Sequence, residues 1–91
     1  MNMTTQKFYY RHIPTGKWCY LYFDYNAPLD FEHYIRRCML IDDLPTDHLF
    51  SAKNVIQEEL TGSVFDDFND KHYALEHIDE FELVEIEVTH R

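Results

Sequence analysis

The stretch KFYYRHIPTGKWCYLYFDY, residues 7–25, predicts a β-hairpin near the start of the chain. Pro14 presets the backbone at the first loop position, and Gly16 can adopt the left-handed conformation that a type I turn with a glycine bulge requires. This turn places Ile13 opposite Lys17 and sorts the flanking side chains onto two faces. One face carries Phe8, Tyr10, His12, Trp18, Tyr20 and Tyr22, and the other carries Lys7, Tyr9, Arg11, Cys19, Leu21 and Phe23. Neither face is polar, which raises the question of what the outer face contacts.

Two helices are predicted after the hairpin. From Pro28 to Ile41, apolar residues recur at helical spacing, which indicates an amphipathic helix. Residues 42–50 are predicted to form a connector, because Pro45 cannot continue a helix and the aspartates around it favour turns. A short second helix follows, with Ser51 as its N-cap, Gly62 as its stop, and a buried stripe of Val55, Ile56 and Leu60.

The last third of the chain is predicted to add more helix and a final strand. Residues 63–79 keep a helical period and are expected to be mostly helical, with a break near Asp70. Residues 81–90, FELVEIEVTH, alternate between apolar and acidic side chains, which is typical of a strand. If this strand lies beside the first one, Glu85 and Glu87 would meet Lys7 and Arg11 on the side away from the helices.

This order of elements predicts a single α+β domain covering residues 1–91. Three strands form an antiparallel sheet in the order β-β-α-α-β, and two or three helices pack on one face. The inner face would hold Phe8, Tyr10, Trp18, Tyr20, Tyr22, Val84, Ile86 and Val88. Tyr9, Leu21 and Phe23 would form an outer apolar strip, which is a candidate oligomer interface. Two alternatives stay open: the C-terminal residues or a shifted helix cover this strip, or a one-residue change of register exchanges the faces.

Charge is distributed unevenly along the chain. Residues 1–41 have a balance of +2 and residues 42–91 a balance of −11, which together give the net charge of −9. Such a field repels phosphate backbones and anionic membranes and attracts basic proteins, so we expect neither direct nucleic-acid binding nor membrane binding. The longest apolar run, WCYLYF, is too short to cross a bilayer, and the first residues do not form a signal peptide. The sequence therefore predicts a soluble, cytoplasmic protein in which Cys19 and Cys38 are buried thiols.

Sequence motifs for catalysis and metal binding fail on inspection. As a calcium loop, FDDFNDKHYALEHI has His72 where the turn glycine belongs and Ile78 where a bidentate carboxylate belongs. On a helix, His72 and His77 would point roughly 140° apart, and neither cysteine has a histidine placed to activate it. We therefore expect no metal, no cofactor and no enzymatic activity, although a small enzyme that uses a pair of histidines stays an alternative.

Carboxylates around aromatic residues are the strongest functional signal in the sequence. The candidate partner-binding surface consists of Asp66, Asp67, Asp70, Glu76, Asp79, Glu80, Glu82 and Glu85. In one interpretation these acids only keep the protein soluble. In the other they imitate the phosphate spacing of a nucleic acid and occupy the basic cleft of a nucleic-acid-binding protein.

The segments FYYRHIPTGKW, residues 8–18, and HIDEFELVEIEV, residues 77–88, resemble small acidic accessory proteins of tailed bacteriophages of the T-even kind. The resemblance implies a protein made during infection that acts in the host cytoplasm by binding a host protein. Several such phage proteins are inhibitors, and some are nucleic-acid mimics. The leading hypothesis is thus a non-enzymatic inhibitor or adaptor for a basic host protein. The alternatives are a homo-oligomeric structural protein that assembles through the outer sheet face, and the small histidine-dependent enzyme.

Overall fold

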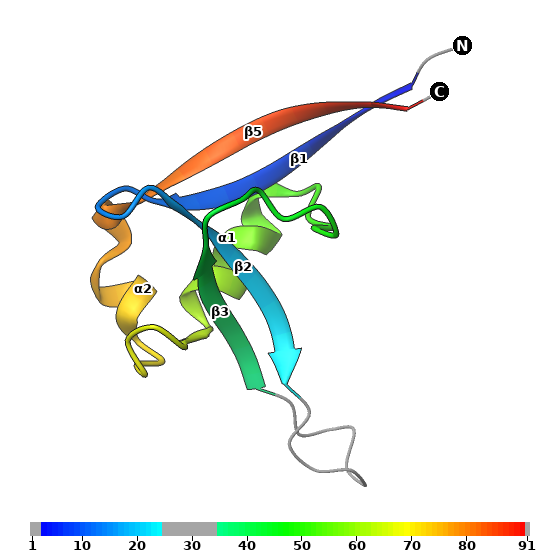
Figure 1. Ribbon diagram of the computed structural model, residues 1–91. Coiled ribbons are helices and arrows are strands. Elements are labelled where there is room, and N and C mark those ends of the chain that lie inside the picture. Colours follow the sequence, from blue (N-terminus) through cyan, green and yellow to red (C-terminus); the bar gives the residue numbers. More distant parts are fainter. Residues whose placement is uncertain (1–2, 25–34, 91) are drawn as a thin grey trace, which may run out of the picture.

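The computed structural model describes residues 3–24 and 35–90 and shows an α+β fold (Figure 1). The strands are β1 (Met3–His12), β2 (Lys17–Asp24), β3 (Ile35–Ile41), β4 (Val64–Phe65) and β5 (Phe81–His90). The helices are α1 (Lys53–Thr61), α2 (Tyr73–Glu76) and the 3-10 turn η1 (Ile78–Glu80). The sheet has five strands in the order β4-β3-β2-β1-β5, and it is mixed because β4 runs parallel to β3. The α+β class is confirmed, whereas the prediction of a three-stranded antiparallel sheet is wrong.

The sheet consists of two ribbons that share one corner. β1 pairs with β5 along its whole length, from Met3 opposite His90 to His12 opposite Phe81, so β5 lies beside β1, which is the arrangement considered from the sequence. β2 pairs with β3 along its whole length as well. Between the ribbons, β1 pairs with β2 at two positions only. Figure 1 shows the consequence: the β1–β5 ribbon extends toward the two termini, while the β2–β3 ribbon runs off in a different direction.

The hairpin register differs from the prediction by one residue. His12, not Ile13, lies opposite Lys17, so the loop has four residues, 13–16. Gly16 does adopt the left-handed conformation, with φ of 71°, and its N–H donates to the carbonyl of His12 at 2.8 Å. The shift turns Cys19 and Leu21 toward the core and leaves Tyr20 on the other face, because successive side chains of a strand alternate. The predicted faces of β2 are therefore exchanged.

The pairing of the last strand also corrects a prediction. Phe8 lies opposite Glu85, and Lys7 lies opposite Ile86. Residues directly opposite one another share a face, so the valines and isoleucine of β5 lie on the face of Lys7 and not on the inner face with Phe8. Glu85 and Glu87 thus do not meet the cations of β1. The ion pair that does form joins Arg11 to Glu82, at 3.3 Å.

Residues 35–41 form a strand where a helix was predicted, while the rest of the predicted helix, residues 28–34, lies outside the described residues. The apolar residues at 35 and 38 fit a helical period, but Cys38 and Leu40 also fit the period of two that pairing with β2 selects. Residues 63–72 form turns around the short β4, so their predicted helical character is wrong. Residues 73–79 are mostly helical in α2 and η1, and the turns before Asp70 agree with the predicted break.

The helix α1 largely follows its prediction. Ile56 and Leu60 are fully buried, and the helix ends at Gly62, whose N–H donates to the main-chain carbonyl of Glu58. Val55 is 41% exposed and is not part of the buried stripe. The N-cap is Ala52, without a side-chain hydrogen bond, so the prediction of Ser51 as the cap is wrong.

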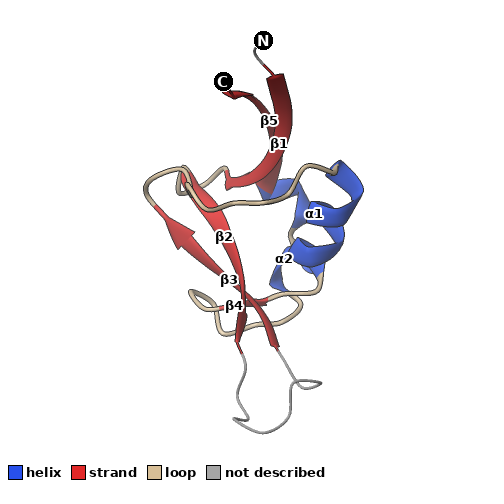
Figure 2. Cartoon of the chain, turned by 90° about the vertical axis from the view of Figure 1, so that its right-hand side faces the viewer, coloured by secondary structure: helices blue, strands red, loops and turns tan. Residues whose placement is uncertain are grey.

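Figure 2 shows α1 and α2 on one side of the β2–β3 ribbon, and the hydrophobic core combines residues of the sheet with residues of both helices. It contains Tyr10, Cys19, Cys38, Leu40, Ile56, Leu60, Phe65, Ala74 and Phe81. Both cysteines are buried free thiols, as predicted. On the opposite face Tyr9 is also buried, because it stacks on His48 of the connector with the rings 4.2 Å apart. The hairpin is therefore aromatic on both faces because the core packs on one face and the connector packs on the other at Tyr9, while Phe23 at the end of β2 is exposed.

Candidate functional site

In the structure the connector covers residues 42–52, between β3 and α1. It lies beside β1 at Phe8, where β1 no longer pairs with β2. The N–H of Phe8 donates to the carbonyl of Phe50 at 3.0 Å, and Nε2 of His48 lies 2.6 Å from the carbonyl of Phe8. Lys7 donates from Nζ to the carbonyl of His48 at 2.8 Å. Burial lowers the pKa of His48, so the ring stays neutral at pH 7 and donates its Nε2 proton to this carbonyl. These contacts hold the connector in the space where β1 and β2 separate.

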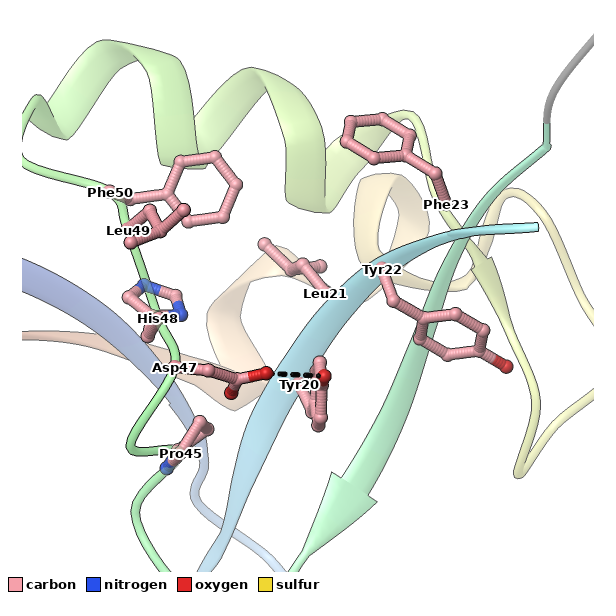
Figure 3. A pocket seen from close by; sticks show the side chains of 9 residues that line it. All are labelled: Tyr20, Leu21, Tyr22, Phe23, Pro45, Asp47, His48, Leu49 and Phe50. Carbon is pink, nitrogen blue, oxygen red and sulfur yellow. Dashed lines mark hydrogen bonds between the residues drawn. The ribbon is translucent and has the colours of Figure 1, made fainter. Parts of the chain in front are cut away.

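A groove of about 410 Å³ lies between the connector and β2, and we call it the β2–connector groove (Figure 3). Its walls include Tyr20, Leu21, Tyr22 and Phe23 from β2, and Pro45, Asp47, His48, Leu49 and Phe50 from the connector. In Figure 3, Leu21 and Phe50 reach toward each other from the two walls. Leu49 is 82% exposed and Phe23 is 46% exposed, so the groove is open and presents apolar side chains to water. Apolar surface that is concave and open is typical of a binding site.

Charge in the groove comes from one residue. Among the described residues that line it, Asp47 is the one with an ionised side chain at neutral pH. Its Oδ2 accepts a hydrogen bond from the hydroxyl of Tyr20 at 2.9 Å, which raises the pKa of Tyr20. The groove is therefore apolar with a single negative charge on the connector side.

Main-chain groups of β2 point into the same groove. The main-chain N–H and C=O of successive residues in a strand point alternately to its two sides. Those of Phe8 point toward the connector, so the main-chain groups of the even-numbered residues of β1 point to the β2 side. His12 lies opposite Lys17, so the main-chain groups of the odd-numbered residues of β2 point back toward β1 and the connector. Leu21 is one of them. No main-chain hydrogen bond within the described part of the chain joins Leu21 to the connector.

Five of the eight predicted acidic residues are engaged within the molecule. Asp66 accepts from the hydroxyl of Tyr22 and pairs with Arg37 at 2.9 Å. Asp67 accepts from the N–H of Leu40, and Asp70 from the N–H of His72, each at 2.9 Å. Glu80 accepts from the hydroxyl of Tyr73 at 3.0 Å, and Glu82 pairs with Arg11. These carboxylates fix turns and strand ends, so they contribute to the fold.

The remaining three, Glu76, Asp79 and Glu85, are exposed and have no hydrogen bond or ion pair among residues 3–24 and 35–90. Asp43, Glu58 and Glu87 share this property, which brings the unpaired carboxylates to six. The cations are used differently: each arginine in the described ranges is in an ion pair, Lys17 pairs with Asp42, and Lys7 donates to a main-chain carbonyl. Lys53 and Lys71 are the lysines of these ranges with neither an ion pair nor a hydrogen bond. The excess negative charge therefore lies on the surface and is not neutralised within the described residues.

The three residues of the candidate oligomer interface do not lie together. Tyr9 is only 4% exposed, and Leu21 packs partly against the core. Since the faces of β2 are exchanged, Leu21 and Phe23 lie on the opposite face of the sheet from Tyr9. The strip predicted from the sequence is thus divided between a buried contact and one wall of the β2–connector groove.

Two reactive side chains of the described residues, Cys38 and His12, lie in the interior of the molecule. Burial, reinforced by the neighbouring Cys19, raises the pKa of the Cys38 thiol, which keeps it protonated and unreactive. His12 is buried with Nδ1 2.8 Å from the hydroxyl of Thr15, and burial lowers its pKa. Within the described residues, no three histidine, cysteine or acidic side chains are grouped so that they could hold a metal ion. No helix in the same part of the chain is long and apolar enough to cross a membrane.

Comparisons with known proteins give no assignment: no protein-family model, no curated protein and no solved structure matches the chain. The resemblance to phage accessory proteins therefore stays a prediction.

The β2–connector groove was not predicted from the sequence. It depends on the separation of β1 and β2 after two residue pairs and on a connector that packs from forty residues away. One signal was present, because DHLF, residues 47–50, puts three large apolar or aromatic side chains into a segment otherwise predicted to be a polar turn. Side chains of this kind in a connector indicate that it packs against the sheet.

Proposed function

We propose that this protein is a non-enzymatic binding module that engages a positively charged protein. The observation that carries the proposal is the set of six exposed, unpaired carboxylates against two unpaired lysines in the described residues. Carboxylates in ion pairs largely cancel with their cations at a distance, so the acids without a cation, these six included, determine the field that an approaching protein meets. That field speeds the encounter with a basic surface and disfavours acidic ones.

The helical side of the molecule offers the best surface for this contact. Glu58 of α1 and Leu75 of α2 line one shallow hollow, and Glu76 follows Leu75 directly. Leu75 is 61% exposed, and Asp79 lies one turn further along the chain in η1. An exposed apolar side chain with one carboxylate in the same hollow and two more close to it in sequence fits the apolar centre and polar rim that protein interfaces use. We call Glu58, Leu75, Glu76 and Asp79 the helical acidic patch.

The more specific forms of this proposal rest on the sequence alone. An inhibitor or adaptor for a host protein, including a nucleic-acid mimic, is what the phage resemblance implies. The alternative of a homo-oligomer would have to use Phe23 without the buried Tyr9. A histidine-dependent enzyme is the third alternative, and loss of an activity on replacing His72 or His77 would support it.

The experiment compares two variants that remove equal charge from different places. One carries Glu58→Gln, Glu76→Gln and Asp79→Asn, and the other carries Asp43→Asn, Glu85→Gln and Glu87→Gln. Each immobilised protein is exposed to a cell lysate at about 50 mM and about 200 mM salt, between which screening of exposed charges becomes strong. We expect the wild type and the second variant to capture basic proteins at the lower salt concentration, and the first variant to lose them. Capture that is unaffected by salt, or equal in both variants, would contradict the proposal.

A further inference from the structure

We propose that the β2–connector groove binds an extended peptide segment of the partner, which adds a strand along β2 and alternates apolar residues with lysine or arginine. The proposal names the form in which the binding module recognises its partner, and it rests on the proposed function.

Main-chain geometry is the first argument. β2 is hydrogen-bonded to β3 on one side, but on the other side it leaves β1 after Trp18. The N–H and C=O of Leu21 point into the groove and have no hydrogen bond to the connector, which forms the other wall. An extended peptide can supply the missing partners, and such strand addition gives affinity without requiring a particular sequence.

The shape and lining of the groove are the second argument. Side chains alternate along a strand, so every second side chain of an added strand would enter the space between Leu21, Leu49 and Phe50. The volume of about 410 Å³ lies within the range of sites that hold small ligands or a few side chains. Burial of the exposed Leu49 against an apolar residue of the peptide would be favourable. The groove therefore selects apolar residues at alternate positions.

The negative charge of the groove and of the whole chain indicates that the peptide residues between the apolar positions are basic. Asp47 is the ionised group among the described residues of the groove, and its neighbour His48 is buried and neutral. The whole chain carries a net charge of −9. A lysine or arginine that follows an apolar anchor would lie beside Asp47 and in this field, whereas an acidic segment would be repelled.

Two other occupants fit less well. A second copy of the chain would bring another net charge of −9 and another Asp47 to the same groove. A small apolar molecule could fill the volume, but it would leave the main chain of Leu21 without partners. The peptide satisfies the main chain, the apolar walls and the negative charge together.

The experiment starts from a yeast-displayed library of random short peptides selected on the wild-type protein. We expect selected peptides to alternate apolar residues with lysine or arginine. Fluorescence anisotropy then measures the affinity of one selected peptide for four variants. Leu49→Lys puts a positive charge on an exposed position of the groove and should weaken binding about tenfold, by lost burial and repulsion. Asp47→Asn keeps an oxygen for Tyr20 and should weaken binding about threefold.

Control variants make comparable changes of charge elsewhere. Leu83→Lys and Glu87→Gln alter exposed residues of β5, outside both the groove and the helical acidic patch, and should change the affinity less than about twofold, since exposed charges away from the site are screened. A peptide methylated at the main-chain nitrogens along one edge should bind about tenfold more weakly or not at all, because each lost hydrogen bond leaves a group of β2 unpaired. Circular dichroism confirms that every variant is folded.

Four outcomes would overturn the proposal. They are the absence of any enriched peptide, enriched peptides without basic residues, affinity unaffected by Leu49→Lys, and equal binding of the methylated peptide, which would indicate an apolar-ligand site. Self-association of the wild type that is abolished by Leu49→Lys would identify a second copy as the occupant. Failure of the proposed function would give a different result. Lysate proteins would then be captured independently of the salt concentration, whether or not the library peptide binds.

Discussion

The outer edge of β5 and the edge of β2 beside the groove differ in their side chains. The outer edge of β5 is ten residues long and carries Glu82, Glu85 and Glu87. The edge of β2 beside the groove is short, has no carboxylate of its own before Asp24, and faces an apolar wall. Charged residues on an edge strand discourage pairing with another chain. Of the two edges, the one at Leu21 of β2 combines main-chain groups that have no bond to the connector with apolar side chains, so it is the better suited to an added strand.

The largest expected effect on stability comes from removing the contact between the connector and β1, which forms one side of the β2–connector groove. His48→Ala removes the ring that stacks on Tyr9 and donates to the carbonyl of Phe8, and it leaves this partly buried carbonyl without that donor. We expect the free energy of unfolding to fall by about 2–4 kcal/mol in urea titration. His72→Ala changes an exposed side chain and serves as the control, with an effect below about 0.5 kcal/mol. Equal losses in the two variants would show that the connector does not support the ribbon.

Acid should weaken the same corner before it affects the β5 edge. Burial lowers the pKa of both His12 and His48, so the unfolded chain binds protons more readily than the folded one. Their contribution is complete above the ordinary value of about 6.5 and is lost as the pH falls, by up to about 1.4 kcal/mol per pH unit for each histidine. Urea titrations between about pH 7.5 and about pH 5.5 measure this loss. Stability that is constant or rises toward low pH would contradict the burial of these rings.

The protection of the β5 edge can be removed directly. Replacing Glu85 and Glu87 by valine makes this edge apolar, and we expect self-association at concentrations of about 10 µM in light scattering. Thr4→Val with Gln6→Val is the matched control, because these residues lie on the same face of the neighbouring strand β1. Association of both double variants would attribute the effect to general hydrophobicity and not to the open edge.

The smallest effect is expected for the ion pair that joins β1 and β5. Both Arg11 and Glu82 are nearly half exposed, so Glu82→Gln should cost about 0.5 kcal/mol or less in urea titration. Glu87→Gln, without a partner among the described residues, should be neutral. A loss well above 1 kcal/mol would mean that this pair helps to fix the register of the ribbon.

Local patterns predicted the elements better than their arrangement. The alternation of residues 81–90, the hairpin around Gly16, and the Ile56–Leu60 stripe ending at Gly62 each depend on neighbours in sequence, and each is confirmed. The register was wrong because Pro14 and Gly16 fit a loop of four residues as well as one of three. β3 was missed because Cys38 fits both periods, and pairing with β2 decides between them.

The candidate site was harder to predict for the same reason. Which acids are free depends on which arginines reach them, as Arg37 reaches Asp66 from another strand. The groove depends on a contact between His48 and Phe8, forty residues apart in the chain. Contacts of this range leave no periodic signal in the sequence.

The pairing of β1 with β5 joins residue 3 to residue 90 and so spans nearly the whole chain. During synthesis, the first strand therefore emerges from the ribosome long before its full-length neighbour exists. Pairings this distant in sequence form slowly, because most of the chain must be ordered to bring the strands together. We expect refolding of this protein to be limited by the closing of that ribbon, and nascent chains that lack the last strand to remain incompletely folded.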